Sequence, residues 1–376
     1  MKGFSVSKVR YDGLDVLKCL CAFFVVCVHC PVPGFLGLVV EVCSRIAVPI
    51  FFMITGFFYE GTVKKGKEFS QIKRIVVLFL GTTLVYGILQ LFFLKELDLT
   101  LDKYVNKIFG ISAFGKLFFF SESSVIFHTL YLAALIGALI FMMFVTRFVK
   151  ENKRNIVYIL CVTLVIFSVI LGRYSRVFLG MDFRVYFSRN VYFIAIPYVV
   201  LGYLLSKGIN TIKEKLNNIY LVIAIVLFSV IGVLEKVILI RTDKLAKDGD
   251  NYFSTLFLSV AVFLIFTKMR FSDNSLNNKL KIIKDKVWNL LTQIGRKYSL
   301  WIYLVHPACI FILQFLAQVL GVEKSFKWLA PGIVFLFTLA IILMVTSIKN
   351  KIFAMIQTNQ LKLEFGKLKF RKKVTN

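Results

Sequence analysis

Apolar runs long enough to cross a lipid bilayer recur along the whole chain, and they restrict its fold more than any other feature. A helix needs roughly 17 to 25 residues to span the hydrocarbon core, and stretches of that length follow one another with short polar connections. Because a backbone in lipid must satisfy its own hydrogen bonds, such runs fold as helices. The sequence therefore predicts an all-α, polytopic membrane bundle of about ten transmembrane helices, at 14–30, 36–59, 75–94, 124–146, 156–171, 190–206, 218–240, 253–267, 298–320 and 328–347.

Positive charge is unevenly distributed between the connections. The formal net charge of +27 raises nucleic acid binding as an alternative. Most of the 47 Lys and Arg residues, however, fall in segments on the same side of a ten-span chain as its amino terminus, which is the distribution of the positive-inside rule. We therefore expect both termini in the cytoplasm, attraction to anionic membrane lipids, and no nucleic acid partner.

No connection is long enough to hold a second folded domain. The sequence predicts one membrane domain over residues 1–348 and a basic cytoplasmic tail over 349–376. Within an inner connection, residues 280–294 place apolar side chains on one helical face, so this segment is predicted to lie flat at the membrane interface.

The stretch LDVLKCLCAFFVVCVH at 14–29 carries an acid, a base and an imidazole inside a predicted span. At about 100° per residue Lys18 and His29 lie on one helix face, separated along the axis by roughly 16 Å. Ionisable groups in lipid are costly and often mark functional sites. We expect Lys18, held by Asp15, toward the cytoplasm and His29 toward the outside. The alternative for Asp15 and Lys18 is an ion pair at the membrane interface, with its charged ends in water.

All three histidines fall in predicted spans, namely His29, His128 and His306. Neutral imidazole acts as an acid, a base or a hydrogen-bond partner near neutral pH. We interpret the three as functional candidates, and the alternative is a structural hydrogen bond at each helix end. Cys27, His29 and Cys30 offer no tetrahedral ligand set, so no metal site is predicted.

The second span carries Glu41 and Arg45 one helical turn apart. Such a pair neutralises its own charges, and a structural pairing and a substrate-binding role both stay open on this evidence. Pro49 removes a backbone donor and is expected to kink the helix. Gly56 permits another helix to approach closely.

Arginines also gather in the outer segment GRYSRVFLGMDFRVYFSRN at 172–190. Guanidinium groups suit phosphate, carboxylate or sugar ligands. Arg189, beside Asn190 at the mouth of a span, is the candidate for ligand binding. The other charged side chains near this face are expected to be solvated, namely Arg173, Arg176, Arg184 and a pair formed by Glu235 and Lys236.

Five stretches resemble, in this order, the acyltransferase 3 family of integral-membrane acyltransferases: LDVLKCLCAFFVVCVHC, SRIAVPIFFMITGFFY, HTLYLAALI, SRNVYFIAIPYVVLGYLLS and YSLWIYLVHP. The resemblance extends over residues 14–310. It implies transfer of an acyl group, often acetyl, from cytoplasmic acyl-CoA to a hydroxyl of a cell-surface or lipid-linked glycan. It also implies a multi-pass protein of a bacterial cell membrane.

The sequence departs from the family pattern at two positions. The first helix of the family usually carries an Arg, ten further residues and then a His, but here Lys18 stands in the Arg position. Lysine cannot form the same bidentate fork to phosphate, which puts the family's role for that Arg in question. Leu130 stands where the family usually has Trp, directly before Tyr131.

The residues and the resemblance together predict a division of roles. His29 is the expected base or transient acyl carrier, with Arg45 or a second histidine stabilising the oxyanion, while Lys18 faces the CoA phosphates. Acyl-CoA is then a co-substrate, and no resident cofactor is expected. Catalytic positions are expected at Asp15, Lys18 and His29, and substrate-binding positions at Glu41, Arg45, His128, Tyr131, Arg189, Tyr303 and His306.

Two other function classes compete with acyl transfer. Buried charges on interrupted helices also suit a transporter for a small polar solute, although the inverted repeat common in transporters is not evident. A non-catalytic scaffold for glycan assembly would not need buried histidines and arginines. The sequence leaves open the acceptor, the acyl group and the oligomeric state.

Overall fold

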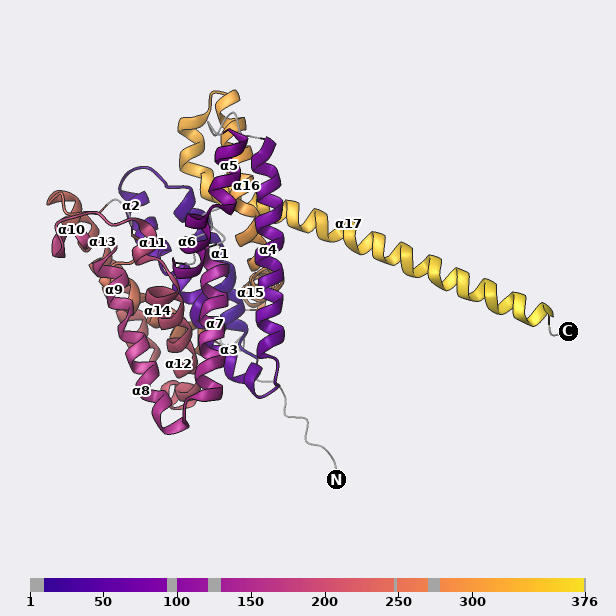
Figure 1. Cartoon of the computed structure of the whole chain (residues 1–376), viewed down its shortest axis with the longest axis horizontal. Coiled ribbons are helices and arrows are strands. Elements are labelled where there is room, and N and C mark those ends of the chain that lie inside the picture. Colours follow the sequence, from indigo (N-terminus) through magenta and orange to yellow (C-terminus); the bar gives the residue numbers. More distant parts are fainter. Residues whose placement is uncertain (1–9, 93–99, 121–129, 247–248, 270–277, 375–376) are drawn as a thin grey trace.

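The computed structural model describes residues 10–92, 100–120, 130–246, 249–269 and 278–374, and within these ranges all regular structure is helical. The predicted all-α class is therefore confirmed (Figure 1). The helices are α1 (Asp12–His29), α2 (Gly34–Ser44), α3 (Ala47–Val63), α4 (Glu68–Phe92), α5 (Leu101–Phe109), α6 (Ile111–Phe120), α7 (Leu130–Phe148), α8 (Glu151–Thr163), α9 (Val165–Ile170), α10 (Ser175–Phe178), α11 (Val185–Ser188), the π-helix η2 (Val191–Ala195), α12 (Ile196–Lys215), α13 (Asn218–Arg241), α14 (Phe253–Lys268), α15 (Asn278–Lys297), α16 (Ser299–Val319) and α17 (Glu323–Val374).

Eight segments of the described chain are long and apolar enough to cross a membrane. They correspond to eight of the ten predicted spans. The remaining two are helices as well, but α1 carries Asp12, Asp15 and Lys18 within its 18 residues, and α14 has only 16 residues. The count of ten is therefore not confirmed, and the cytoplasmic placement of both termini stays a prediction. Helix α17 runs without interruption past residue 348, so the division between membrane domain and tail also stays a prediction.

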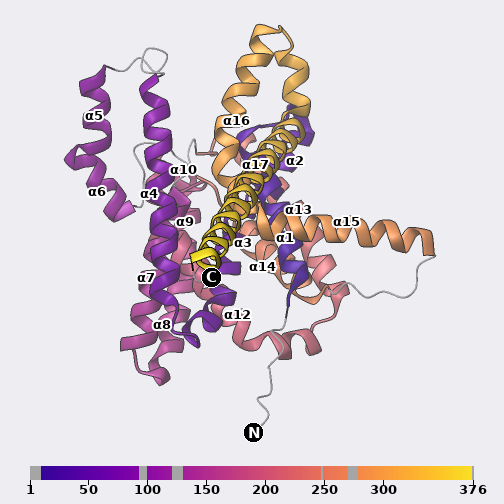
Figure 2. The ribbon, with the colours of Figure 1, turned by 90° about the vertical axis from the view of Figure 1, so that its right-hand side faces the viewer.

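Helix α1 occupies the centre of the bundle, where it packs against α3, α14 and α16 and against the crosswise helix α15. Figure 2 shows α15 running across the direction of α4, as expected for the predicted interfacial segment. A Cβ atom on Gly295 of α15 would lie 1.7 Å from the backbone oxygen of Asp15, so only glycine allows this approach. The contact fixes α15 against the first turns of α1.

Helices α3 and α12 pack with their backbones in direct contact. A Cβ atom on Gly56 would lie 1.8 Å from the Val199 carbonyl oxygen, and one on Gly202 would lie 2.0 Å from that of Met53. The two glycines therefore face each other's helices reciprocally, which is the small-residue packing expected in membranes. The prediction that Gly56 permits close helix approach is confirmed.

A helix break separates α2 from α3 at Arg45 and Ile46. Pro49 lies in the first turn of α3 and lacks the N–H that would donate to the carbonyl four residues earlier, which is that of Arg45. The predicted effect of Pro49 is therefore observed as a break one turn upstream. It places the Arg45 side chain at the end of a helix, close to the interior of the bundle.

Candidate functional site

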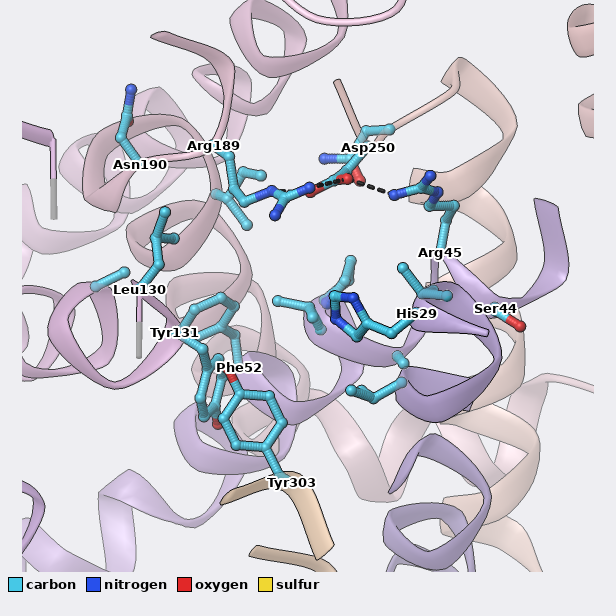
Figure 3. Close-up of a pocket in the computed structure, with 18 residues that line it drawn as sticks. His29, Ser44, Arg45, Phe52, Leu130, Tyr131, Arg189, Asn190, Asp250 and Tyr303 are labelled. Atoms are coloured by element: carbon cyan, nitrogen blue, oxygen red, sulfur yellow. Dashed lines mark hydrogen bonds and ion pairs between the residues drawn. The ribbon is translucent and has the colours of Figure 1, made fainter. Parts of the chain in front are cut away.

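A small cavity lies among α1, α3, α7, η2, α16 and the connection before α14, with room of about 80 Å³ for water-sized molecules. We call it the His29 cavity. Its polar lining comes from His29 at the end of α1, Arg45 at the α2–α3 break, Arg189 before η2, and Asp250 before α14. Figure 3 shows Arg189, Asp250 and Arg45 in a row, with the His29 ring between this row and the rings of Phe52, Tyr131 and Tyr303.

Two of the three histidines pack together beside this cavity. The rings of His29 and His306 lie with their centroids 5.4 Å apart. His306 is fully buried, and its Nδ1–H donates to the Ile302 carbonyl oxygen at 3.1 Å. Because a carbonyl only accepts, this bond assigns the proton to Nδ1 and leaves a lone pair on Nε2 in the neutral ring. The third histidine, His128, lies outside the described residues.

Asp250 joins the two arginines of the His29 cavity. Its carboxylate accepts from the guanidinium groups of both Arg45 and Arg189 (Figure 3). Burial disfavours the charged form of this carboxyl, but Arg189 and Arg45 outweigh burial and hold the pKa of Asp250 below its ordinary value. The aspartate therefore stays ionised at neutral pH, and it fixes two guanidinium groups from opposite sides of the cavity.

A second carboxylate extends this charge network behind the cavity wall. Glu41 accepts from Arg45 at 2.7 Å and from Arg173 at 3.0 Å, and it also accepts from Lys236. The predicted Glu41–Arg45 pair is confirmed as a contact, but it is one part of a larger cluster. Two carboxylates and four cationic groups meet here, so positive charge is in excess.

Two predictions about solvated side chains are wrong. Arg173 is only 8% exposed, because the connection before α14 folds over it and Glu41 compensates its charge. Lys236 binds Glu41 and not its neighbour Glu235, whose carboxylate accepts instead from the backbone N–H of Ser254 at 3.2 Å. Arg184 is exposed as expected.

Local hydrogen bonds hold the arginine and aspartate segments in place. The Asn190 side chain accepts from the backbone N–H groups of Tyr192 and Phe193, both at 3.0 Å, and so fixes the turn that carries Arg189. Asn251 donates to the Ser168 hydroxyl at 3.0 Å, which ties the connection beside Asp250 to α9. Gly249 has φ of 131° and packs directly on the backbone at Arg173, a conformation that favours glycine.

A second, larger cavity of about 600 Å³ lies on the other side of Tyr131 and Tyr303. We call it the Lys18 cavity. Lys18 donates to Asp15 at 3.0 Å, and Arg296 of α15 binds the other oxygen of the same carboxylate at 2.8 Å. Lys67 and Arg74 also line this cavity, and the described part of the chain shows no carboxylate bound to either.

The fold thus gathers most, but not all, of the predicted positions around one cavity. His29, Arg45, Tyr131, Arg189 and Tyr303 line the His29 cavity, while His306 and Glu41 lie directly behind that lining. Lys18 lines the Lys18 cavity, and Asp15 binds it as its ion-pair partner. Among the described residues, no group of three His, Cys, Asp or Glu side chains is placed to hold a metal ion.

Sequence reasoning missed four charged residues of the two cavities. Asp250 and Arg74 lie outside or at the edge of apolar runs, where charge is ordinary, so hydropathy gave no signal for them. Lys67 and Arg296 are likewise single members of basic connections. The only available clue was the nearby polar pair of Asp250 and Asn251 directly before a short apolar helix.

Comparison with known proteins identifies similar sequences over most of the chain. A family described as an acyltransferase domain matches residues 11–348. A serine/alanine racemase of Enterococcus gallinarum is 24% identical over 336 residues, which cover 84% of this chain. The chain spans 43% of the length of that racemase. No solved structure matches the chain significantly.

Proposed function

The chain belongs to the family of acyltransferase domains that its residues 11–348 match, and from this premise we propose that it transfers a short acyl group from cytoplasmic acyl-CoA to a hydroxyl of a cell-surface or lipid-linked glycan. The observation that carries this proposal is the arrangement of two cavities back to back. One holds an imidazole and two guanidinium groups, and the other holds four cationic side chains.

The His29 cavity has the groups that acyl transfer to a hydroxyl requires. A base must take the hydroxyl proton, and cationic or N–H groups must stabilise the oxyanion. His29 is the proposed base, with Arg45 or His306 beside the developing negative charge. The hydroxyl oxygen bonds to the thioester carbonyl carbon, the carbon–sulfur bond breaks, and the imidazole returns its proton to the departing thiolate. In the alternative order, the imidazole first accepts the acyl group and then passes it to the hydroxyl.

The Lys18 cavity suits the phosphate-bearing part of the donor. Cationic side chains bind phosphate through charge-assisted hydrogen bonds. Lys18, Arg296 and Arg10 share the two carboxylates of Asp15 and Asp12, so three cationic groups face two carboxylates and the net charge of this group is positive. Arg74 supplies a fork of donors in the same cavity, which is the chemistry that Lys18 lacks. We propose that Arg74 and Lys18 together contact the CoA phosphates.

Transport of a small polar solute is the second candidate. The relative from Enterococcus gallinarum is named a serine/alanine racemase, and an amino acid would suit the mixed charges of the His29 cavity. The same two cavities would then be the two ends of a carrier path.

One experiment separates the two functions. Inside-out membrane vesicles containing the protein are supplied with acyl-labelled acetyl-CoA, or with labelled serine or alanine. Label transferred covalently to lipid-linked or surface glycan, and lost with His29→Ala, supports the enzyme. Movement of labelled amino acid across the vesicle membrane without acylation supports the carrier. Absence of glycan label in vesicles from a strain that produces the protein would refute acyl transfer.

A further inference from the structure

Two tyrosines line both cavities at once. Tyr131 of α7 and Tyr303 of α16 belong to the lining of the His29 cavity and to that of the Lys18 cavity. Their rings meet edge to face, with centroids 5.2 Å apart. Both side chains are buried, at 9% and 6% exposure respectively. The pair therefore forms a wall with one cavity on each face.

Two phenylalanines of α3 extend this wall. Phe52 lines the His29 cavity and packs on Tyr131 at 4.7 Å between centroids, whereas Phe51 lines the Lys18 cavity and lies 6.1 Å from the same ring. Tyr131 is thus held between neighbours that belong to opposite cavities. Packed aromatic rings at such distances attract each other beyond simple burial, so the wall is closed by mutual contacts in this conformation.

From this geometry we propose that Tyr131 and Tyr303 form an aromatic partition that the acyl group must pass, and that the partition with Phe52 restricts transfer to short acyl chains. The inference rests on the proposed function for its acyl part. The two sizes support it, because the Lys18 cavity has room of about 600 Å³ and the His29 cavity only about 80 Å³. A cavity of roughly 150 Å³ holds one benzene molecule, so the smaller space beside His29 has no room for a chain of many carbons.

The partition is tested first without any assumption about catalysis. Val48 and Thr55 lie seven residues apart on α3 and line the His29 cavity and the Lys18 cavity respectively. Single variants Val48→Cys and Thr55→Cys are labelled with a membrane-impermeant thiol reagent added from one side of the membrane at a time. The labelling of the parent protein is subtracted from that of each variant, because all of them keep the native cysteines.

With both tyrosines present, Val48→Cys is expected to react only from the side of the His29 cavity, and Thr55→Cys only from the side of the Lys18 cavity. Adding Tyr303→Ala to Val48→Cys is expected to make that thiol reactive from the side of the Lys18 cavity, whereas Tyr303→Phe, which keeps the ring, is not. Tyr131→Leu serves in the same way if Tyr303→Ala does not yield folded protein. Reaction of Val48→Cys from the Lys18 side while both tyrosines are intact would overturn the partition, as would an unchanged pattern in the variants without a ring.

The selectivity is tested with acetyl-, butyryl- and hexanoyl-CoA as donors to the glycan in vesicles. A methylene that does not fit is worth about 10- to 200-fold in discrimination, so the protein is expected to prefer acetyl over butyryl by at least about tenfold. Phe52→Ala or Tyr303→Ala is expected to remove most of that preference. Transfer with the same donor preference in these variants would refute the inference while leaving the proposed function intact. Absence of transfer from every donor would refute the proposed function, and the thiol result would still decide the partition.

Discussion

The imidazole rings of His29 and His306, which are 277 positions apart in the sequence, pack against each other at 5.4 Å between centroids. The burial of His306 and its bond to Ile302 fix the orientation of one ring, and that ring supports the other at the edge of the His29 cavity. This relationship places His29 in the lining of the cavity and His306 behind it.

His29→Ala is expected to lower the rate of acyl transfer by about 10² to 10⁴, the usual contribution of a positioned acid or base. The measurement is glycan acylation from labelled acetyl-CoA in vesicles with equal amounts of protein. Affinity for acetyl-CoA, measured on the purified variant, is expected to stay unchanged, because the donor phosphates are proposed to bind in the other cavity. Full activity in the variant would exclude His29 as base and as carrier.

Arg74→Ala is expected to raise the KM for acyl-CoA by roughly 10- to 100-fold with little change in kcat. This follows from the loss of a charge-assisted hydrogen bond worth about 1.5 to 3 kcal/mol. Lys18→Arg is expected to lower KM, since the guanidinium fork contacts phosphate at two points. Lys65→Ala, in the connection between α3 and α4, is the control and should leave KM unchanged. Equal effects of Arg74→Ala and Lys65→Ala would argue against a specific phosphate site.

Asp250→Ala is expected to destabilise the protein by about 3 to 5 kcal/mol, because removal of one partner from a buried ion pair leaves the other charge uncompensated. The readout is thermal unfolding of the detergent-solubilised protein. Asp182→Asn is the matched control, since Asp182 pairs with Arg176 at 2.7 Å at a more exposed position and such pairs contribute about 0 to 1 kcal/mol. A control as unstable as Asp250→Ala would show that the assay does not report on the buried network.

The same aspartate predicts a pH dependence. The pKa of Asp250 is lower in the folded protein than its ordinary value of about 3.9. The stabilisation is therefore fully present above the ordinary pKa and is lost as the pH falls toward the folded pKa. The stability difference between the protein and Asp250→Asn is expected to be constant from pH 7 to about pH 5 and to shrink below about pH 4. A difference that widened on acidification would mean that the sign of the shift is wrong.

Gly202→Ala is expected to destabilise the bundle strongly, since the added Cβ atom would lie 2.0 Å from the Met53 carbonyl oxygen and the two backbones would have to separate. Gly81→Ala on α4 is the control, because nothing lies within 4 Å of a Cβ atom there. That variant is expected to be neutral or more stable by about 0.5 to 1 kcal/mol, the helix preference of alanine over glycine. Thermal unfolding of both proteins in one detergent measures the contrast, and similar losses in both would contradict it.

The sequence predicted the helices well and the charge network only in part. Apolar length and periodicity located the spans because each span meets the lipid on its own. The pair Glu41–Arg45 was predictable because its partners lie one turn apart. The third member, Asp250, comes from a connection more than 200 positions away in the chain. Such a contact depends on how α13 and α14 pack relative to α2, and the local pattern of residues does not predict it.

The sequence does not predict the partition, for a related reason. Tyr131 and Tyr303 are each ordinary aromatic residues of membrane helices. Their shared role follows only from the packing that brings Tyr131 of α7 against Tyr303 of α16 and against Phe51 and Phe52 of α3.

The glycine contact between α3 and α12 also determines where the bundle is able to open. Two backbones in direct contact cannot slide without a clash, so α3 and α12 behave as one rigid body. Phe52 lies on α3, and the turn that carries Arg189 precedes η2 and α12. Tyr303 lies outside this body, on a helix already interrupted in its bonding by Pro307. Pro307 cannot donate the helical hydrogen bond to the carbonyl four residues earlier, which is that of Tyr303, so a bend of α16 next to this tyrosine breaks one fewer hydrogen bond than a bend elsewhere in the helix.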